Sequence, residues 1–256
     1  MGASQAIDLG RERSVGEILR AALDMYRRYP LLFAALAVGV IAPYELARLA
    51  VTGDGPFGSG GNGNAGVLFL FEVLDFSLVG PLISALHVHA VVEIGDGRRP
   101  RFGSVALQGL RVLPVVAAAE IIANLLIGLG TLAFIVPGLL LALRWSVVAQ
   151  TAAVDHEGWL PALRRSRGLT AGNYWRILGL LLTVGVLSFA VSSAASAASV
   201  GSSTSVGSVA IGIAVQTITA SFVALTLAIL YFDLRAREPE PERGQMPEYQ
   251  HLHDLD

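Results

Sequence analysis

The chain has 256 residues, of which 54% are hydrophobic and only 15% are charged, whereas a soluble domain usually carries about 25% charged residues. Its formal net charge is -2, and it contains neither cysteine nor lysine. These absences exclude disulfides, thiolate nucleophiles, Schiff-base lysines and the lysine of a P-loop. The composition favours a membrane protein, and the distribution of charge along the chain is more informative than its sum.

Sixteen of the eighteen arginines fall in four patches that alternate with long apolar stretches. The patches are Arg11, Arg13, Arg20, Arg27 and Arg28; Arg98, Arg99, Arg101 and Arg111; Arg164, Arg165, Arg167 and Arg176; and Arg235, Arg237 and Arg243. Each apolar stretch is long enough to cross a bilayer and return, and the connections on the far side contain no basic residue. Because basic residues gather on the cytoplasmic side, we predict an all-α, polytopic membrane protein. Its six transmembrane helices would form three hairpins, with both termini in the cytoplasm.

The N-terminal part of the chain is expected to contain an amphipathic helix before the first span. The predicted divisions are a flexible tail at 1–13, a helical transmembrane domain at 14–236 and an acidic, disordered tail at 237–256. Apolar residues recur at helical spacing from Ser14 to Tyr29, and Ser14 and Glu17 have the spacing of a capping box. This helix is predicted either to lie among the lipid headgroups or to pack on the helix bundle.

The six predicted spans cover 30–51, 67–94, 114–136, 139–154, 174–191 and 209–232. Basic segments at 98–113 and 159–173 precede the second and third hairpins, so that each of three units joins a basic, amphipathic lead-in to a hydrophobic hairpin. Such repeats occur in transporters, and they also arise when any stable hairpin is duplicated. Pro137 and Gly138 are expected to form the turn between the third and fourth spans. A Ser/Ala/Gly-rich connector, 192–208, is expected between the fifth and sixth.

Five charged residues are predicted to lie within the outer half of the membrane: Glu45, Arg48, Glu72, Asp75 and Arg144. A charge at the centre of a transmembrane helix costs about 3 kcal/mol on insertion scales, so each is a functional candidate. Glu45 and Arg48 share one helix face. Glu72 and Asp75 share another. Two interpretations remain open: a site for a cation, a proton or a polar headgroup, or an internal network of ion pairs that only holds the helices together.

A second polar set is predicted nearer the cytoplasm: His89, Glu93 and Glu120. His89 and Glu93 are one helical turn apart, but no third ligand stands at motif spacing, so we expect no metal site. Glu120 with His89 is a conceivable acid-base pair for a lipid reaction. The chain carries no GxSxG, HExxH, P-loop or dinucleotide-binding motif. We therefore expect a protein that is not an enzyme and has no cofactor.

The basic lead-in segments supply candidate ligands for anionic lipid headgroups: Arg27, Arg28, Arg164, Arg165 and Arg167. An arginine close to an anionic membrane surface contributes about 1 kcal/mol of favourable electrostatic free energy to membrane binding. The expected partners are the anionic lipids of the cytoplasmic leaflet, and no nucleic-acid partner is expected.

The segment from Ile135 to Trp175 carries a recognisable pattern. It reads IVPGLLLALRWSVVAQTAAVDHEGWLPALRRSRGLTAGNYW, and the last span ends in LYFDLRAR at Leu230 to Arg237. The Pro-Gly pair, the helix with an early arginine, the acidic turn, the ALRRSRGLTAGNYW stretch and the closing DLR resemble a membrane-domain family. That family accompanies some bacterial glycerophosphodiester phosphodiesterases, and stand-alone YciC-like inner-membrane proteins are similar to it.

The resemblance implies a module of the bacterial inner membrane rather than an enzyme. Family members that hydrolyse glycerophosphodiesters use a separate barrel domain, which we do not find in this sequence. We therefore expect a non-catalytic scaffold or lipid-associated membrane module. The alternative is a transporter of a small solute or lipid that uses the buried carboxylates.

Overall fold

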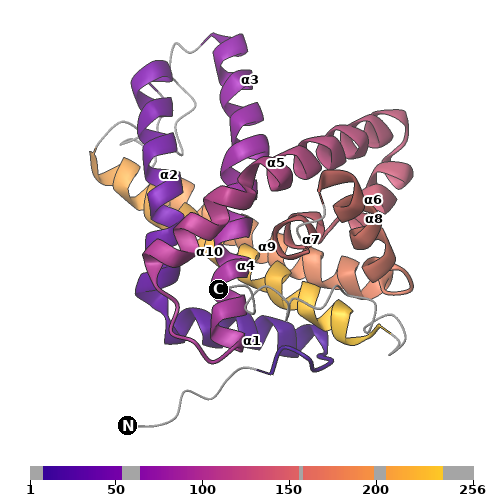
Figure 1. The fold of residues 1–256 in the computed structure, drawn as a ribbon. Coiled ribbons are helices and arrows are strands. Elements are labelled where there is room, and N and C mark those ends of the chain that lie inside the picture. Colours follow the sequence, from indigo (N-terminus) through magenta and orange to yellow (C-terminus); the bar gives the residue numbers. More distant parts are fainter. Residues whose placement is uncertain (1–7, 54–63, 156–157, 199–205, 239–256) are drawn as a thin grey trace.

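The computed structural model describes residues 8–53, 64–155, 158–198 and 206–238 (Figure 1). Every regular element in those ranges is a helix. Six helical stretches are long and apolar enough to cross a membrane. The all-α, polytopic prediction is therefore confirmed, and the chain is a multi-pass membrane protein.

In chain order the helices are α1 (Val15–Arg28), α2 (Pro30–Thr52), α3 (Ala65–Leu74), the π-helical turn η1 (Asp75–Val79), α4 (Gly80–Gly95), α5 (Phe102–Ala133), α6 (Ile135–Arg144), α7 (Val148–Val154), α8 (Trp159–Thr170), α9 (Tyr174–Ala198) and α10 (Val206–Ala236). The six membrane-crossing stretches are α2, α3 to α4 through η1, α5, α6 with α7, α9 and α10. Each corresponds to one predicted span.

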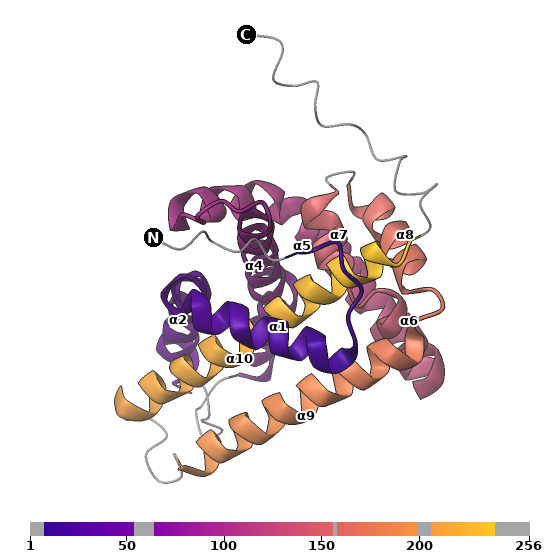
Figure 2. The same cartoon turned by 90° about the horizontal axis from the view of Figure 1, so that it is seen from below.

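Helix α1 lies across one end of the bundle, against α10 (Figure 2). Its apolar face buries Ile18, Ala22 and Met25 completely. The predicted capping box is present, because the Ser14 side chain accepts from the Glu17 backbone N–H and the Glu17 carboxylate accepts from the Ser14 backbone N–H. The hydrogen bond that the Ser14 backbone N–H donates to the Glu17 carboxylate is the main reason why the pKa of Glu17 lies below its ordinary value. The structure therefore favours packing on the bundle over a separate interfacial helix.

Helix α10 forms the centre of the domain. It packs against α1, α2, α4 and α9, and nearly all its side chains from Ala224 to Leu234 are buried. Tyr231 is the largest fully buried side chain of the described residues. An apolar helix that is enclosed by its neighbours is stabilised by close packing, because lipid supplies no hydrophobic force between helices.

The turn between the third and fourth spans differs from the prediction. It lies at Phe134, whose extended backbone ends α5 and begins α6, whereas Pro137 and Gly138 lie inside the first turn of α6. Proline is tolerated there because the first N–H groups of a helix have no intrahelical partner. A Cβ atom on Gly138 would lie only 2.6 Å from the Thr131 Cα atom. The glycine therefore serves the close contact between α5 and α6 rather than a turn.

Two predicted boundaries are also wrong. The basic segment 98–113 is not separate from the third span, because α5 continues through Pro114 without a break. Proline is accommodated in membrane helices because neighbouring groups can satisfy the backbone that it frees. The predicted connector 192–208 is helical at 192–198 in α9 and at 206–208 in α10, while 199–205 lie outside the described residues. The tail predicted at 1–13 and the tail at 237–256 are likewise described only at 8–13 and at 237–238.

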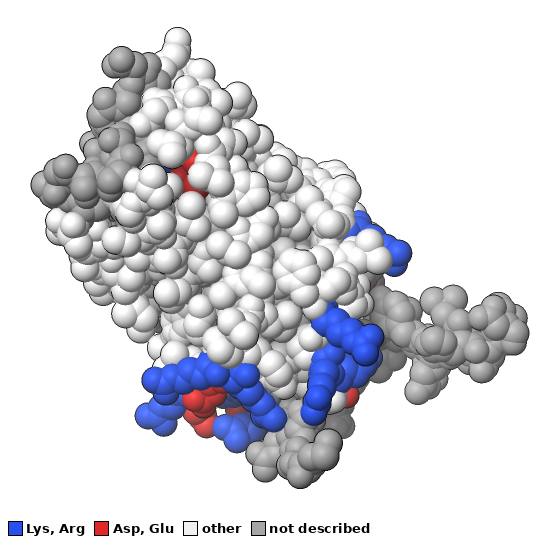
Figure 3. Space-filling view, turned by 90° about the vertical axis from the view of Figure 1, so that its left-hand side faces the viewer, with Lys and Arg blue, Asp and Glu red and all other residues white. Residues whose placement is uncertain are grey.

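Exposed arginines gather at one end of the molecule, and the body between the ends is uncharged over most of the visible face (Figure 3). We call this the basic end, and it includes α1, α8, the start of α9 and the end of α10, which contact one another. Arg27, Arg28, Arg164 and Arg167 are exposed there. The charge separation fits a bundle whose apolar middle lies in lipid and whose basic end lies at a headgroup surface.

Candidate functional site

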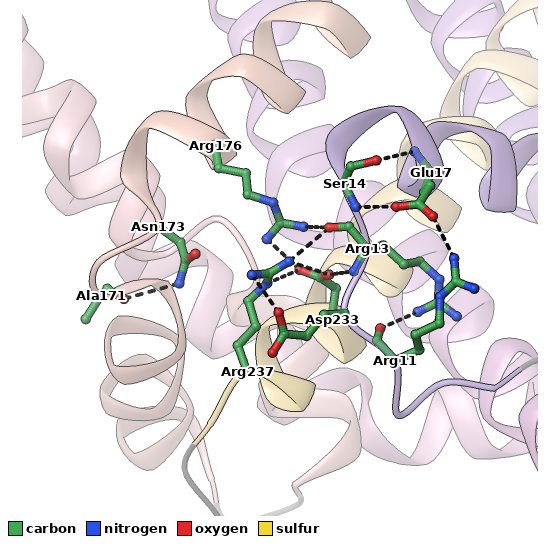
Figure 4. Close-up of polar contacts among 10 residues, drawn as sticks. Arg11, Arg13, Ser14, Glu17, Ala171, Asn173, Arg176, Asp233 and Arg237 are labelled. Carbon is green, nitrogen blue, oxygen red and sulfur yellow. Dashed lines mark hydrogen bonds and ion pairs between the residues drawn. The ribbon is translucent and has the colours of Figure 1, made fainter.

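The basic end contains a fully buried carboxylate, that of Asp233 in α10. Arg176 of α9 forms an ion pair with it at 2.6 Å, and Arg237, the first residue after α10, approaches it at 3.2 Å. The backbone N–H of Arg13 donates a third contact at 2.5 Å. Figure 4 shows these groups converging on one point. Because a buried charge is tolerated only when it is paired and hydrogen-bonded, the contacts explain how Asp233 can be enclosed.

The Arg13 carbonyl oxygen completes this arrangement from the other side. It accepts hydrogen bonds from Arg176 and, at 3.1 Å, from Arg237. Arg237 also pairs with Glu12 at 3.0 Å. Residues 8–13, which we assigned to the N-terminal tail, are therefore bound to the helical domain through Arg13. We call Arg13, Arg176, Asp233 and Arg237 the Asp233 network.

The network was not among the predicted sites. The closing DLR pattern contains Asp233, and the GNYW pattern lies immediately before Arg176, but neither was assigned a role from the sequence. The available signal was a lone carboxylate at the end of a long apolar span, where burial without a counterion would be costly. Both carboxylate oxygens of Asp233 are engaged by groups of the protein, so the geometry indicates a structural junction rather than a reacting centre.

A pocket lies beside the network, between α8 and the end of α10. Its volume is about 440 Å³, and its lining includes Arg164, Arg165, Asn173, Arg237 and Glu238. We call it the arginine pocket. Both carboxylate oxygens of Glu238 contact Arg165, at 2.5 and 2.6 Å. The chain thus places one of its own anions in a pocket that three arginines line.

Arg165 is also held from the side of the bundle. Its Nε atom lies 3.9 Å from the carboxylate of Asp155, at the end of α7. The buried Tyr231 hydroxyl donates to the same carboxylate at 2.9 Å. Asp155 and Tyr231 therefore help to orient the Arg165 guanidinium toward the pocket.

The five predicted headgroup ligands all lie at the basic end. Arg27 and Arg28 are exposed at the end of α1, and Arg164 and Arg167 are exposed on α8. Arg165 differs from them because it is half-buried and already paired with carboxylates. The structure thus separates four exposed arginines, of which Arg164 also lines the arginine pocket, from Arg165, which is half-buried in that pocket.

Four of the five predicted intramembrane charges lie together. Glu45 in α2 is only 2% exposed and its carboxylate lies 3.6 Å from Arg48. Asp75, the first residue of η1, interacts electrostatically with Glu72, Glu45 and Arg48. Tyr44 adds a link between the helices, because its hydroxyl donates to the Phe71 carbonyl at 2.9 Å. We call Glu45, Arg48, Glu72 and Asp75 the intramembrane cluster.

Arg144 is placed apart from that cluster, at the end of α6. Its carbonyl oxygen accepts hydrogen bonds from Ser166 at 3.0 Å and Thr170 at 3.2 Å, both on α8. Because α6 packs on α5, α8 and α9, its last residue meets the basic lead-in helix instead of α2 and α3.

The second predicted polar set is divided between two helices that pack together, α4 and α5. His89 and Glu93 are both buried on α4. Glu120 on α5 accepts a hydrogen bond from Asn124, one turn along the same helix, at 3.3 Å. Within the described residues, no three His, Asp or Glu side chains are placed to hold a metal ion.

Comparison with known proteins gives one family. A family model described as a domain of unknown function, DUF7847, matches residues 76–234, from η1 to the end of α10. No curated protein and no solved structure matches the chain. The matched region includes the arginine pocket apart from its last residues, and it includes Arg176 and Asp233.

Proposed function

The chain belongs to the DUF7847 family, and from the geometry of its basic end we propose that it is a non-catalytic, lipid-associated membrane module. It would lie in a bacterial inner membrane with its basic end and both termini in the cytoplasm. Its partners would be anionic lipids of the cytoplasmic leaflet. The resemblance to the membrane domain that accompanies glycerophosphodiester phosphodiesterases supports the same proposal.

One observation carries this proposal: exposed arginines gather at the end of an otherwise apolar helical bundle (Figure 3). Four of them, Arg27, Arg28, Arg164 and Arg167, extend from α1 and α8. At about 1 kcal/mol for each arginine near an anionic surface, together they would contribute about 4 kcal/mol at most. Such attraction is screened by salt, which gives the proposal a measurable signature.

A variant with Arg27, Arg28, Arg164 and Arg167 all changed to glutamine is expected to lose anionic lipid. Native mass spectrometry after release from nanodiscs of mixed phosphatidylglycerol and phosphatidylcholine would measure the lipids that remain bound. The wild type is expected to retain phosphatidylglycerol preferentially at low salt, and the preference should fall as salt increases. The glutamine variant should show little preference at either salt concentration.

The matched control changes the same four residues to lysine, which keeps the charge and removes only the forked geometry. The lysine variant should retain most of the preference for phosphatidylglycerol. The lipid proposal is overturned if the glutamine variant keeps the wild-type preference, or if the wild type retains both lipids equally.

A second candidate function, transport of a small solute or lipid, is supported by the intramembrane cluster. Buried ionisable residues mark ion and proton pathways in many membrane proteins. The cluster also adjoins η1, and π-helical turns occur frequently at functional sites. Asp75 belongs to both features.

If the cluster relays protons, Asp75→Asn should abolish proton flux in proteoliposomes that contain a pH-sensitive dye. Asp96→Asn is the matched control, because Asp96 has an exposed ion pair with Arg98. The control should conduct as the wild type does. Absence of flux in the wild type, or equal flux in Asp75→Asn, would leave the cluster with the role of holding α2 against α3.

A further inference from the structure

The position of Glu238 indicates what the arginine pocket can bind. Its two carboxylate oxygens meet the two terminal nitrogens of Arg165 at 2.5 and 2.6 Å. Guanidinium groups use the same two-pronged geometry to bind phosphate. We propose that the arginine pocket is a binding site for a phosphate group, and that Glu238 occupies it as an internal competitor.

The charge of the pocket favours an anion that carries more negative charge than one carboxylate. Arg164, Arg165 and Arg237 line it, and among the described residues Glu238 is the single acidic residue of its lining. Arg237 is engaged mainly with Asp233 and Glu12, whereas Arg164 is exposed. A phosphate monoester carries about -1.5 to -2 charges near neutral pH, so it would neutralise this lining better than one carboxylate does.

The pocket is also prepared for an anion that exchanges with Glu238. Asp155 and Tyr231 hold Arg165 from the side of the bundle, so the guanidinium would keep its orientation when Glu238 leaves. Glu238 lies just after the last residue of α10, beyond the buried part of the helix, and can leave without unfolding the core. The volume of about 440 Å³ accommodates a phosphate with a glycerol-sized substituent.

The ligand class is therefore a terminal phosphate group, either in the monoester headgroup of a lipid such as phosphatidic acid or as free inorganic phosphate. This inference deepens the proposed lipid association and rests on it, but it centres on Arg165 and Glu238 and shares only Arg164 with the four surface arginines. The surface arginines would attract any anionic lipid, whereas the pocket would distinguish a monoester from the diester of phosphatidylglycerol.

Isothermal titration calorimetry on the full chain in neutral detergent tests this inference. The probes are inorganic phosphate, dihexanoyl phosphatidic acid and dihexanoyl phosphatidylglycerol. Because Glu238→Gln removes the competitor, it is expected to bind phosphatidic acid roughly tenfold more tightly than the wild type does. Asp96→Asn removes an equal charge outside the pocket and should leave the affinity unchanged. Arg165→Lys keeps the charge but loses the two-pronged contact, and should bind more weakly than the wild type.

Each outcome has a defined meaning. Tighter binding of both phosphatidic acid and inorganic phosphate by Glu238→Gln would show that the phosphate alone is recognised, and tighter binding of the lipid alone would assign the site to a headgroup. The inference would be overturned if Glu238→Gln and the wild type bound phosphatidic acid with equal affinity and also bound inorganic phosphate with equal affinity. If that result came with intact, salt-sensitive retention of phosphatidylglycerol in nanodiscs, only the pocket proposal would fail. If the retention were also absent, the lipid-associated function itself would fail.

Discussion

Replacing Asp233 with alanine is expected to destabilise the helical domain by about 3–5 kcal/mol, the usual cost of removing one partner from a buried ion pair. Asp233 is fully buried, and its removal takes away the carboxylate that the Arg176 guanidinium and the Arg13 backbone N–H both contact. Unfolding in detergent, followed by tryptophan fluorescence as denaturant is added, would measure the difference. The start of α1 should also become more accessible to protease, because the Arg13 backbone N–H loses its hydrogen bond to the Asp233 carboxylate.

Asp96→Asn is the control for this prediction. The Asp96 carboxylate pairs with Arg98 at 2.9 Å, but both side chains are exposed, and exposed ion pairs contribute only about 0–1 kcal/mol. The control should unfold at the same denaturant concentration as the wild type. If Asp233→Ala also unfolded at that concentration, Asp233 could not be the group that holds the segment of Arg13, the start of α9 and the end of α10 together.

Gly138→Ala is the second change with a large expected effect. The added Cβ would lie 2.0 Å from the Thr131 Oγ1 atom and 2.6 Å from its Cα atom. The helices α5 and α6 would have to separate, and overpacking of this kind costs about 1–3 kcal/mol. Thermal unfolding in detergent should show a lower midpoint for the variant than for the wild type.

Gly128→Ala provides a matched test on the same helical hairpin. A Cβ at Gly128 meets nothing within 4 Å, and alanine is favoured over glycine inside a helix by about 1 kcal/mol. This variant should therefore be as stable as the wild type or more stable. Equal effects of the two substitutions would mean that the close contact at Gly138 does not limit the packing of α5 on α6.

The spans were predictable because length, apolar composition and arginine placement each report on the membrane directly. The turn at Phe134 was not, because a Pro-Gly pair signals a turn in soluble chains, while in this hairpin both residues fit the first turn of a helix. A proline likewise led to the predicted boundary between the segment 98–113 and the third span. The structure has no boundary there, because α5 continues through Pro114 without a break. Local signals of this kind do not include the neighbouring helices that permit proline and glycine within a span.

The sites show a similar division. The partners Glu45 and Arg48, and likewise Glu72 and Asp75, share a face by helical spacing, and the structure places these four together. The position of Arg144 depends on how α6 packs against α8, which spacing along one helix cannot reveal. Asp233 and Arg13 are 220 residues apart in sequence, so their contact has no local signature.

The Asp233 network also has a consequence for the order in which the protein is made. Chains emerge from the ribosome at about 5–20 residues per second, and their N-terminal parts fold first. Arg13 and Arg176 are synthesised well before Asp233, which supplies the carboxylate that both contact. During translation, the contacts of Arg13 and Arg176 with the Asp233 carboxylate must therefore wait until α10 has been made. Packing of α10 is the step that completes the Asp233 network, and a nascent chain that stalls before Asp233 would leave its N-terminal segment more exposed to quality-control proteases.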